Sequence, residues 1–360
     1  MTRFIYAVLR FGIAFGLAGL LIRPLVKEIK PESLDGVNWL WVALAVVLYG
    51  WVLLIGVFRW RILLAVQGIE TRIMDIVKLN LIGQFFNIAI PGSVSGDLVK
   101  MVYIRDHAGS KQAAAVLTIM LDRVMGLLGL LLIALVSTAI SWDYVQASQD
   151  PRIRVAVYWI AALSGCGVVG LLALEFHVAL ERLPGIRSLI NLAQRLLPDS
   201  VCAVFGRLVA ALDLYRERRS AIAAVIALSV LVHGSLAISY MAIGQGLHIE
   251  NVGANLYFLT TQVANAIASI PVVPGGLGIR DAVFNAIFTD CNVEPAKSAL
   301  LPLLGTGAMV IWSVIGGIVF ACTKRKGAKS QEEAAEPTAA KPPPAEPDER
   351  ADPPAHDGEH

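Results

Sequence analysis

Charged side chains are scarce in this 360-residue sequence: only 16% of the residues are Asp, Glu, Lys or Arg, whereas 56% are hydrophobic. Soluble globular proteins carry about 25% charged and about 45–50% apolar residues. The composition therefore predicts an integral membrane protein. It argues against a nucleic-acid-binding protein, because such a protein needs a basic face on a soluble fold.

Cysteine is also rare, and its spacing indicates no site. The four cysteines lie far apart and form no CxxC pair, so neither a zinc site nor a redox motif is indicated. The sequence also lacks a GxSxG elbow, a P-loop, an HExxH motif and paired carboxylates, which are the local signatures of common catalytic sites. We therefore expect a protein that is not an enzyme and that has no metal and no cofactor.

Long uncharged stretches are abundant. A bilayer core about 30 Å thick needs roughly 20 apolar residues per helix. The stretches that meet this requirement are 38–58, 124–142, 155–174, 221–243 and 298–323, with 4–22 as a further candidate anchor that contains one arginine. The sequence thus predicts about six full spans.

Two further uncharged segments, 79–96 and 251–279, differ from these spans because proline and glycine interrupt them. Both contain Gln-x-x-Asn, then a Pro-Gly turn, a glycine and an aspartate. In the first segment these residues are Gln84, Asn87, Pro91, Gly92, Gly96 and Asp97; in the second they are Gln262, Asn265, Pro274, Gly275, Gly276, Gly278 and Asp281. We interpret the two segments as a degenerate internal repeat.

The positive-inside rule favours re-entrant hairpins for these two segments. If both segments turn back within the membrane, every cluster of Lys and Arg falls on the cytoplasmic side. Both termini are then cytoplasmic, and the two hairpins enter the membrane from opposite sides. Eight crossings are the alternative. The predicted fold is an all-α polytopic helical bundle in the inner membrane, with a central polar chamber, because non-helical backbone at membrane depth must be buried or line a wet cavity.

Two segments outside the spans have their own character. The loop 175–220 carries seven arginines at a spacing that fits either interfacial helices on anionic headgroups or a solvated helical pair. The tail 324–360 contains seven prolines and few apolar residues, which is typical of disorder. The expected domains are a transmembrane domain, 1–323, and this cytoplasmic tail.

Asp122 and Arg123 are notable because they lie inside an apolar stretch that begins near residue 113. Charges at such depth are costly and indicate function or a specific partner. One interpretation is that they contact the substrate. The other is that they pair with charges on the hairpins, for example Asp122 with Arg280 and Arg123 with Asp97, and fix the geometry.

Each Pro-Gly turn is predicted to begin a second half-helix, whose free N–H groups favour anions. Lys100 and Arg280 follow the two turns closely, so each turn could hold a phosphate. The four amides of the repeat, Gln84, Asn87, Gln262 and Asn265, would line the cavity as uncharged hydrogen-bonding groups or, alternatively, cap each other across the hairpins.

The sequence Arg59-Trp60-Arg61 follows the span 38–58 and is most simply an interfacial anchor. His233 lies alone within a predicted helix. A hydrogen bond to a neighbouring helix is the favoured role, and a proton relay is the alternative.

Taken in order, these motifs resemble the lysylphosphatidylglycerol synthase transmembrane family, also called flippase-like domain proteins. The resemblance covers about residues 5–323 and rests on Gly83-Gln84-Phe85-Phe86-Asn87, Pro91-Gly92-Ser93, Gly96-Asp97, Leu121-Asp122-Arg123 and Pro274-Gly275-Gly276-Leu277-Gly278. It implies a multi-spanning domain that moves a lipid or a lipid-linked headgroup between leaflets. The aminoacyl-transferase domain of the synthases does not follow the last span here, and Lys100 and Asp281 stand where many relatives carry Arg and Glu.

The leading hypothesis is a lipid translocase for an anionic phospholipid or polyprenyl phosphate, with Lys100, Arg123 and Arg280 as headgroup contacts. The alternative is a scaffold or accessory subunit for a lipid-modifying or glycan-assembly enzyme. Deletion of 329–360 would distinguish the two hypotheses, because a scaffold that docks through its tail should lose function and a translocase should not. A transferase with Asp122 as its base ranks lowest because no nucleophile is evident. Self-association or contact with a lipid-synthesis enzyme is a further expectation.

Overall fold

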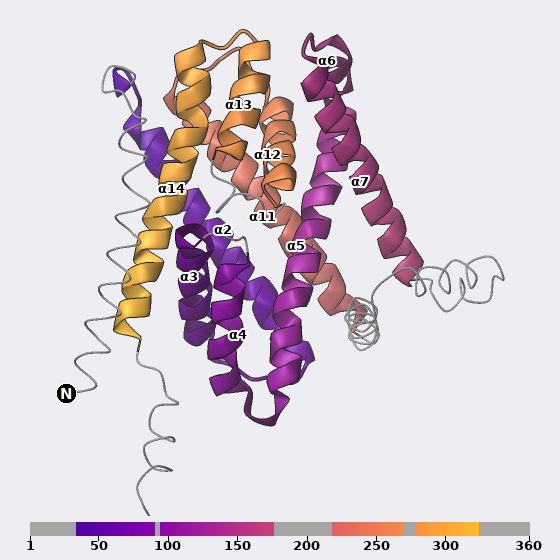
Figure 1. Cartoon of the computed structure of the whole chain (residues 1–360), viewed down its shortest axis with the longest axis vertical. Coiled ribbons are helices and arrows are strands. Elements are labelled where there is room, and N and C mark those ends of the chain that lie inside the picture. Colours follow the sequence, from indigo (N-terminus) through magenta and orange to yellow (C-terminus); the bar gives the residue numbers. More distant parts are fainter. Residues whose placement is uncertain (1–33, 91–93, 176–217, 270–277, 324–360) are drawn as a thin grey trace, which may run out of the picture. The chain divides into compact units, whose positions relative to one another are not determined.

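The computed structural model describes residues 34–90, 94–175, 218–269 and 278–323, and these residues form an all-helical assembly (Figure 1). The predicted anchor 4–22, the tail and nearly all of the arginine-rich loop lie outside the described residues. The same holds for five turn residues of the predicted repeat, Pro91, Gly92, Pro274, Gly275 and Gly276.

Four long helices dominate the bundle: α2 (Trp39–Val66), α5 (Gln112–Ile140), α11 (Arg219–Gly246) and α14 (Pro295–Cys322). Each has 28 or 29 residues, which corresponds to about 42 Å and exceeds the thickness of a bilayer core. All four are apolar enough to cross a membrane, α5 as part of the helical run Ser95–Ile140. The predicted polytopic helical fold is confirmed.

The two proline- and glycine-interrupted segments form helical hairpins. α3 (Ile73–Ala89) packs against α4 (Ser95–Ala108), and α12 (Ala254–Ala268) packs against α13 (Ile279–Asp290). These helices have 12 to 17 residues, so each spans about 18–26 Å and is too short to cross a core of about 30 Å alone. Their lengths favour re-entrant hairpins over additional spans.

The two hairpins flank opposite halves of α14. Leu301, near its start, shares a buried cluster with Phe284 of α13. Gly316, near its end, contacts α3 so closely that a Cβ atom there would lie 2.1 Å from the Leu81 carbonyl oxygen. Fifteen residues separate Leu301 from Gly316, or about 22 Å of helix. Figure 1 shows the same opposition, with α3 and α4 below and α12 and α13 above.

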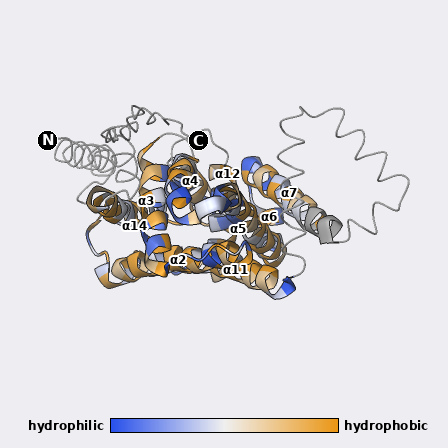
Figure 2. Cartoon of the chain, turned by 90° about the horizontal axis from the view of Figure 1, so that it is seen from below, coloured by the Kyte–Doolittle hydropathy of each residue, from blue (hydrophilic) through white to orange (hydrophobic). Residues whose placement is uncertain are grey.

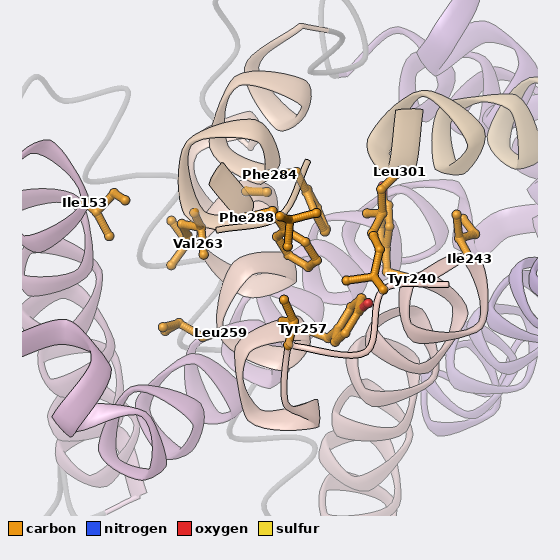
Figure 3. Packing of buried hydrophobic residues seen from close by; sticks show 14 of the residues in the cluster. Ile153, Tyr240, Ile243, Tyr257, Leu259, Val263, Phe284, Phe288 and Leu301 are labelled. Carbon is orange, nitrogen blue, oxygen red and sulfur yellow. The ribbon is translucent and has the colours of Figure 1, made fainter. Parts of the chain in front are cut away.

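Aromatic rings form the core around the second hairpin (Figure 3). The rings of Tyr240 and Phe284 lie 4.4 Å apart, and those of Tyr257 and Phe288 lie 5.0 Å apart. A separate buried cluster beside the first hairpin contains Trp60, Leu64, Ile76, Ile104 and Leu121. Each hairpin therefore has its own packed support.

The shorter helices complete the bundle. η2 (Gly109–Lys111) joins α4 to α5, and α6 (Trp142–Ala147) precedes α7 (Pro151–Glu175), which covers the predicted stretch 155–174. Large apolar side chains remain exposed on the outer surface, such as Leu40 and Trp159, and Figure 2 shows hydrophobic residues along α2 and α11. Exposed apolar surface of this extent suits contact with lipid.

Candidate functional site

A bidentate ion pair joins α2 to α5. Arg59 Nε donates to Asp122 Oδ1 at 2.7 Å and Arg59 Nη2 donates to Asp122 Oδ2 at 3.0 Å. Arg59 Nη1 also donates to Ser229 Oγ of α11 at 3.2 Å. Two parallel bonds from a guanidinium to a carboxylate are among the strongest charge-assisted contacts in proteins. Three long helices therefore meet at Arg59.

The interpretation of Arg59 and Trp60 as an interfacial anchor is wrong. α2 continues to Val66, so both residues lie inside the helix, and Arg59 is buried. Trp60 is buried as well, and its Nε1 donates to Thr118 Oγ1 at 3.0 Å. Arg61 is the exposed member of the triplet.

A second ion pair joins the first hairpin to α5. Arg123 Nε donates to Asp97 Oδ2. The side chain of Asp97 is 5% exposed, whereas that of Arg123 is 51% exposed. The carboxylate of this pair is therefore buried and the guanidinium is accessible. The suggested pairing of Arg123 with Asp97 is present, but Asp122 binds Arg59 and not Arg280.

Lys100 of α4 lies beside these pairs. Its Nζ donates to Asn80 Oδ1 at 2.8 Å and lies 5.4 Å from the centre of the Trp60 ring. Asp97 lies three residues before Lys100 on α4, and Trp60 lies next to Arg59 on α2. We call Arg59, Asp97, Lys100, Asp122 and Arg123 the charge cluster.

The charge cluster contains three cations and two carboxylates. Both carboxylates pair with arginines. Within the part of the chain that the structure describes, the partners of the Lys100 amine are neutral, namely an amide oxygen and an aromatic face. The charge cluster therefore carries one excess positive charge.

The described contacts of the Lys100 amine lie away from the end of α3, and the Pro-Gly turn that it was predicted to serve lies outside the described residues. Its partner Asn80 lies nine residues before Ala89, the last residue of α3, which is about 14 Å of helix away from the turn. The amine is directed toward Asn80 and Trp60, beside the charge cluster.

The amides of the first hairpin connect its parts. Asn87 Oδ1 accepts a hydrogen bond from the Gly96 N–H at 2.9 Å and so caps the beginning of α4. Gln84 Nε2 donates to the Tyr49 hydroxyl at 2.9 Å. The described contacts of these two amides are thus with Gly96 of their own hairpin and with Tyr49 of α2.

The second hairpin has a related arrangement. Arg280 Nε donates to Asn265 Oδ1 at 3.1 Å, and its Nη1 contacts Met309 Sδ at 3.0 Å. Asp281 Oδ2 accepts from the Gly278 N–H at 3.0 Å and caps the beginning of α13. Gly278 has φ +80°, a conformation that glycine adopts readily and other residues rarely do.

The two hairpins share one feature that motif reading missed. In each, a cation on the second helix is bound by an asparagine on the first: Lys100 by Asn80, and Arg280 by Asn265. Asn80 lies one turn before Gln84, on the same face of α3, and this i, i+4 spacing is the signal that could have identified it.

Met309 of α14 lies close to residues of both hairpins. Ile88, close to the end of α3, shares a buried cluster with Tyr49 of α2 and Met309 of α14. Met309 is the residue that Arg280 contacts. Met309 therefore connects the described end of α3 with Arg280 at the beginning of α13.

His233 forms the expected hydrogen bond to a neighbouring helix. Its Nε2 lies 3.1 Å from the Gly126 carbonyl oxygen of α5. Gln262 Nε2 of the second hairpin donates to the His233 carbonyl oxygen at 3.3 Å. These contacts extend the polar interior from α5 to α12.

The fold and the buried charges define a polytopic helical membrane protein with two opposed hairpins. Residues 7–317 match the family described as the lysylphosphatidylglycerol synthase TM region, and the chain belongs to this family. A similar protein is the UPF0104 membrane protein PH1989 of Pyrococcus horikoshii, which is 21% identical over 301 residues, covering 77% of this chain and 85% of that protein. Family membership connects the chain with lipid handling in the membrane.

Proposed function

We propose that this protein moves an anionic phospholipid or a lipid-linked phosphate between the leaflets of the inner membrane. The charge cluster binds the phosphate of the headgroup, and the acyl or prenyl chains stay in the bilayer. The observation that carries the proposal is the excess positive charge of the cluster at Lys100, whose described partners are neutral.

The Lys100 amine suits a phosphate in donor number and charge. An ammonium group has three N–H donors, and Asn80 accepts one of them. Lys100 is half-buried, and its described partners are neutral. A phosphate would supply an anionic partner through charge-assisted hydrogen bonds. Arg59 is less suited, because three of its five N–H donors already bind Asp122 and Ser229.

Arg123 provides a second contact for the headgroup. Half of its side chain is exposed while its acid partner Asp97 is buried, so a phosphate can reach the guanidinium without opening the core. Asp97 and the phosphate then compete for Arg123. Because Asp97 belongs to α4, this competition links headgroup binding to the position of the first hairpin.

Arg280 supplies a cation on the opposed hairpin. Its described side-chain contacts, Asn265 and Met309, are neutral, as they are for Lys100. A phosphate that leaves the charge cluster would therefore find a second cation on the other half of the bundle. Such opposed sites at broken helices are how many transporters provide access from both sides.

The test is a leaflet-exchange assay in proteoliposomes with fluorescent phosphatidylglycerol and a fluorescent polyprenyl phosphate. Lys100→Gln removes the charge and keeps a hydrogen-bond donor. The matched control is Lys78→Gln, because Lys78 is exposed on α3. A hydrogen bond to a charged group is worth about 1.5–3 kcal/mol, so Lys100→Gln should slow exchange at least about tenfold.

Lys78→Gln should exchange lipid at the wild-type rate. Absence of exchange of both lipids by the wild-type protein would contradict the proposal. Equal rates for Lys100→Gln and wild type would contradict the assignment of the phosphate to the charge cluster.

A further inference from the structure

The two hairpins differ in how well their buried polar atoms are satisfied. Within the part of the chain that the structure describes, no buried side-chain oxygen or nitrogen of α3 or α4 lacks a hydrogen-bond partner. Six residues of α12 and α13 carry such an unpartnered atom: Tyr257, Thr260, Thr261, Gln262, Asn265 and Asp281. Buried polar groups nearly always have partners, and each exception is costly. The polar groups of the second hairpin are therefore poorly satisfied in the arrangement observed here.

The first hairpin is attached to its neighbours by contacts that fix its position. Asn80 Nδ2 donates to a backbone carbonyl oxygen of α2 at 3.0 Å, and Gln84 Nε2 donates to the Tyr49 hydroxyl of α2 at 2.9 Å. On α14, a Cβ atom at Gly316 would lie 2.1 Å from the Leu81 carbonyl oxygen. Hydrogen bonds require a particular geometry, so a displacement of α3 would break these contacts with α2.

The second hairpin is held against the long helices α11 and α14 mainly by apolar contacts. Phe284 and Phe288 of α13 are completely buried in the cluster beside these helices. The described polar contacts are weaker. Gln262 Nε2 lies 3.3 Å from the His233 carbonyl oxygen, and Arg280 contacts a thioether of α14, which is a weak acceptor. Because apolar attraction is non-directional, α12 and α13 can shift at a lower cost than α3.

Two hydrogen bonds tie the open end of the second hairpin to the corner between α5 and α6. The Tyr144 hydroxyl of α6 donates to Asp290 Oδ2, at the end of α13, at 3.0 Å. Asn255 Nδ2, at the beginning of α12, donates to Ser141 Oγ at 3.1 Å. Figure 1 shows α6 and α13 at the same end of the bundle. We call these two contacts the latch.

We propose that the second hairpin is the element that moves during translocation and that the latch holds it in the arrangement observed here. The first hairpin stays bound to α2 and α14 through α3. When the latch opens, α13 carries Arg280 with it, and the unpartnered atoms of α12 and α13 reach new partners. The inference rests on the proposed function and specifies which half of the bundle moves.

The experiment locks each hairpin in turn with a reducible thiol cross-linker. The four native cysteines are first replaced by serine. Tyr144→Cys with Asp290→Cys then places one thiol on each side of the latch. The matched control is Gln67→Cys with Lys111→Cys, which ties the segment after α4 to the end of α2, because Lys111 Nζ lies 3.2 Å from the Gln67 carbonyl oxygen. Leaflet exchange of phosphatidylglycerol is measured before cross-linking, after cross-linking and after reduction.

The cross-linked latch variant should lose exchange to the level of protein-free vesicles and should regain it on reduction. The cross-linked control should exchange lipid at its own uncross-linked rate. A folding defect cannot produce this difference, because each variant is compared with itself. Unchanged exchange in the cross-linked latch variant, or an equal loss in the cross-linked control, would overturn the moving hairpin and leave the proposed function standing.

A second measurement does not depend on transport. Amide hydrogen exchange reports local opening of a structure. In wild-type protein it should be faster in α12 and α13 than in α3 and α4, and Tyr144→Phe, which removes one donor of the latch, should raise it in the second hairpin alone. Equal or slower amide exchange in α12 and α13 would refute the moving hairpin. Absence of lipid exchange in every uncross-linked protein would refute the proposed function, and amide exchange would still decide whether the second hairpin moves.

Discussion

Arg59 and Asp122 join α2 to α5 through two parallel hydrogen bonds of 2.7 and 3.0 Å. Both side chains are largely buried, with exposures of 11% and 17%. A buried ion pair often contributes little to stability compared with apolar residues of the same size, but the loss of one partner leaves an uncompensated charge. This asymmetry allows the structural role of the pair to be measured separately from transport.

Asp122→Leu should destabilise the protein by about 3–5 kcal/mol, because Arg59 would remain buried and charged. The double variant Arg59→Met with Asp122→Leu should recover most of this loss. The measurement is the thermal unfolding midpoint in detergent, with Asp143→Leu as a control at an exposed position. Equal midpoints for the single and double variants would show that the pair does not act as a unit.

The accessible pair of Arg123 and Asp97 should separate stability from transport. Arg123→Ala removes the ion partner of a buried carboxylate and should lower the unfolding midpoint. Addition of Asp97→Asn removes the buried charge and should restore the midpoint. Exchange of phosphatidylglycerol should stay low in both variants, because Arg123 is proposed to contact the headgroup. Recovery of exchange together with stability would assign Arg123 a purely structural role.

Gly96 allows the closest approach between the two helices of the first hairpin. A Cβ atom there would lie 1.9 Å from the Gly83 carbonyl oxygen, and backbone cannot yield as a flexible side chain can. Gly96→Ala should therefore greatly reduce the yield of folded protein, measured by size-exclusion chromatography in detergent. Gly165→Ala is the control, since a Cβ atom at Gly165 in α7 meets nothing within 4 Å. There the change should be neutral or should stabilise the helix by up to about 1 kcal/mol. Equal yields for the two variants would show that α3 and α4 can separate without loss of the fold.

Arg280 tests the second hairpin. The described contacts of Arg280, Asn265 and Met309, are both neutral. Arg280→Gln therefore leaves no unpaired charge at either contact. Its unfolding midpoint should remain close to that of the wild type, whereas exchange of phosphatidylglycerol should fall about tenfold. Arg152→Gln, at an exposed position, should exchange lipid normally. Unchanged exchange in Arg280→Gln would limit the headgroup site to the first hairpin.

The hairpins could be predicted from sequence because a Pro-Gly pair with further glycines interrupts the apolar pattern of each segment, whereas a single proline such as Pro302 lies inside the continuous helix α14. The partners of the buried charges were harder to predict. Hydropathy placed the end of the first confident span before the charged Arg59, but the helix continues to Val66, and Asp122 pairs with Arg59 inside the bundle. An ion pair between residues 63 positions apart leaves no mark in the local sequence.

The position of Lys100 was missed for a similar reason. Its closeness in sequence to the Pro-Gly turn suggested a turn site, but a long flexible side chain can point along either direction of a hairpin. The small Gly83 opposite gives it space, since a Cβ atom there would lie 2.3 Å from Lys100 Cε, and Asn80 supplies an acceptor. Both the space beside Gly83 and the position of the Asn80 acceptor depend on the packing of α3 against α4.

The most direct test of the account is the headgroup preference of leaflet exchange in proteoliposomes. Fluorescent phosphatidylglycerol and phosphatidylcholine, which differ in net charge, are compared for the wild type and Lys100→Gln. The excess positive charge of the charge cluster predicts that the wild type moves the anionic lipid faster and that Lys100→Gln loses this preference. Equal rates for both lipids in the wild type, or an undiminished preference in Lys100→Gln, would contradict the account.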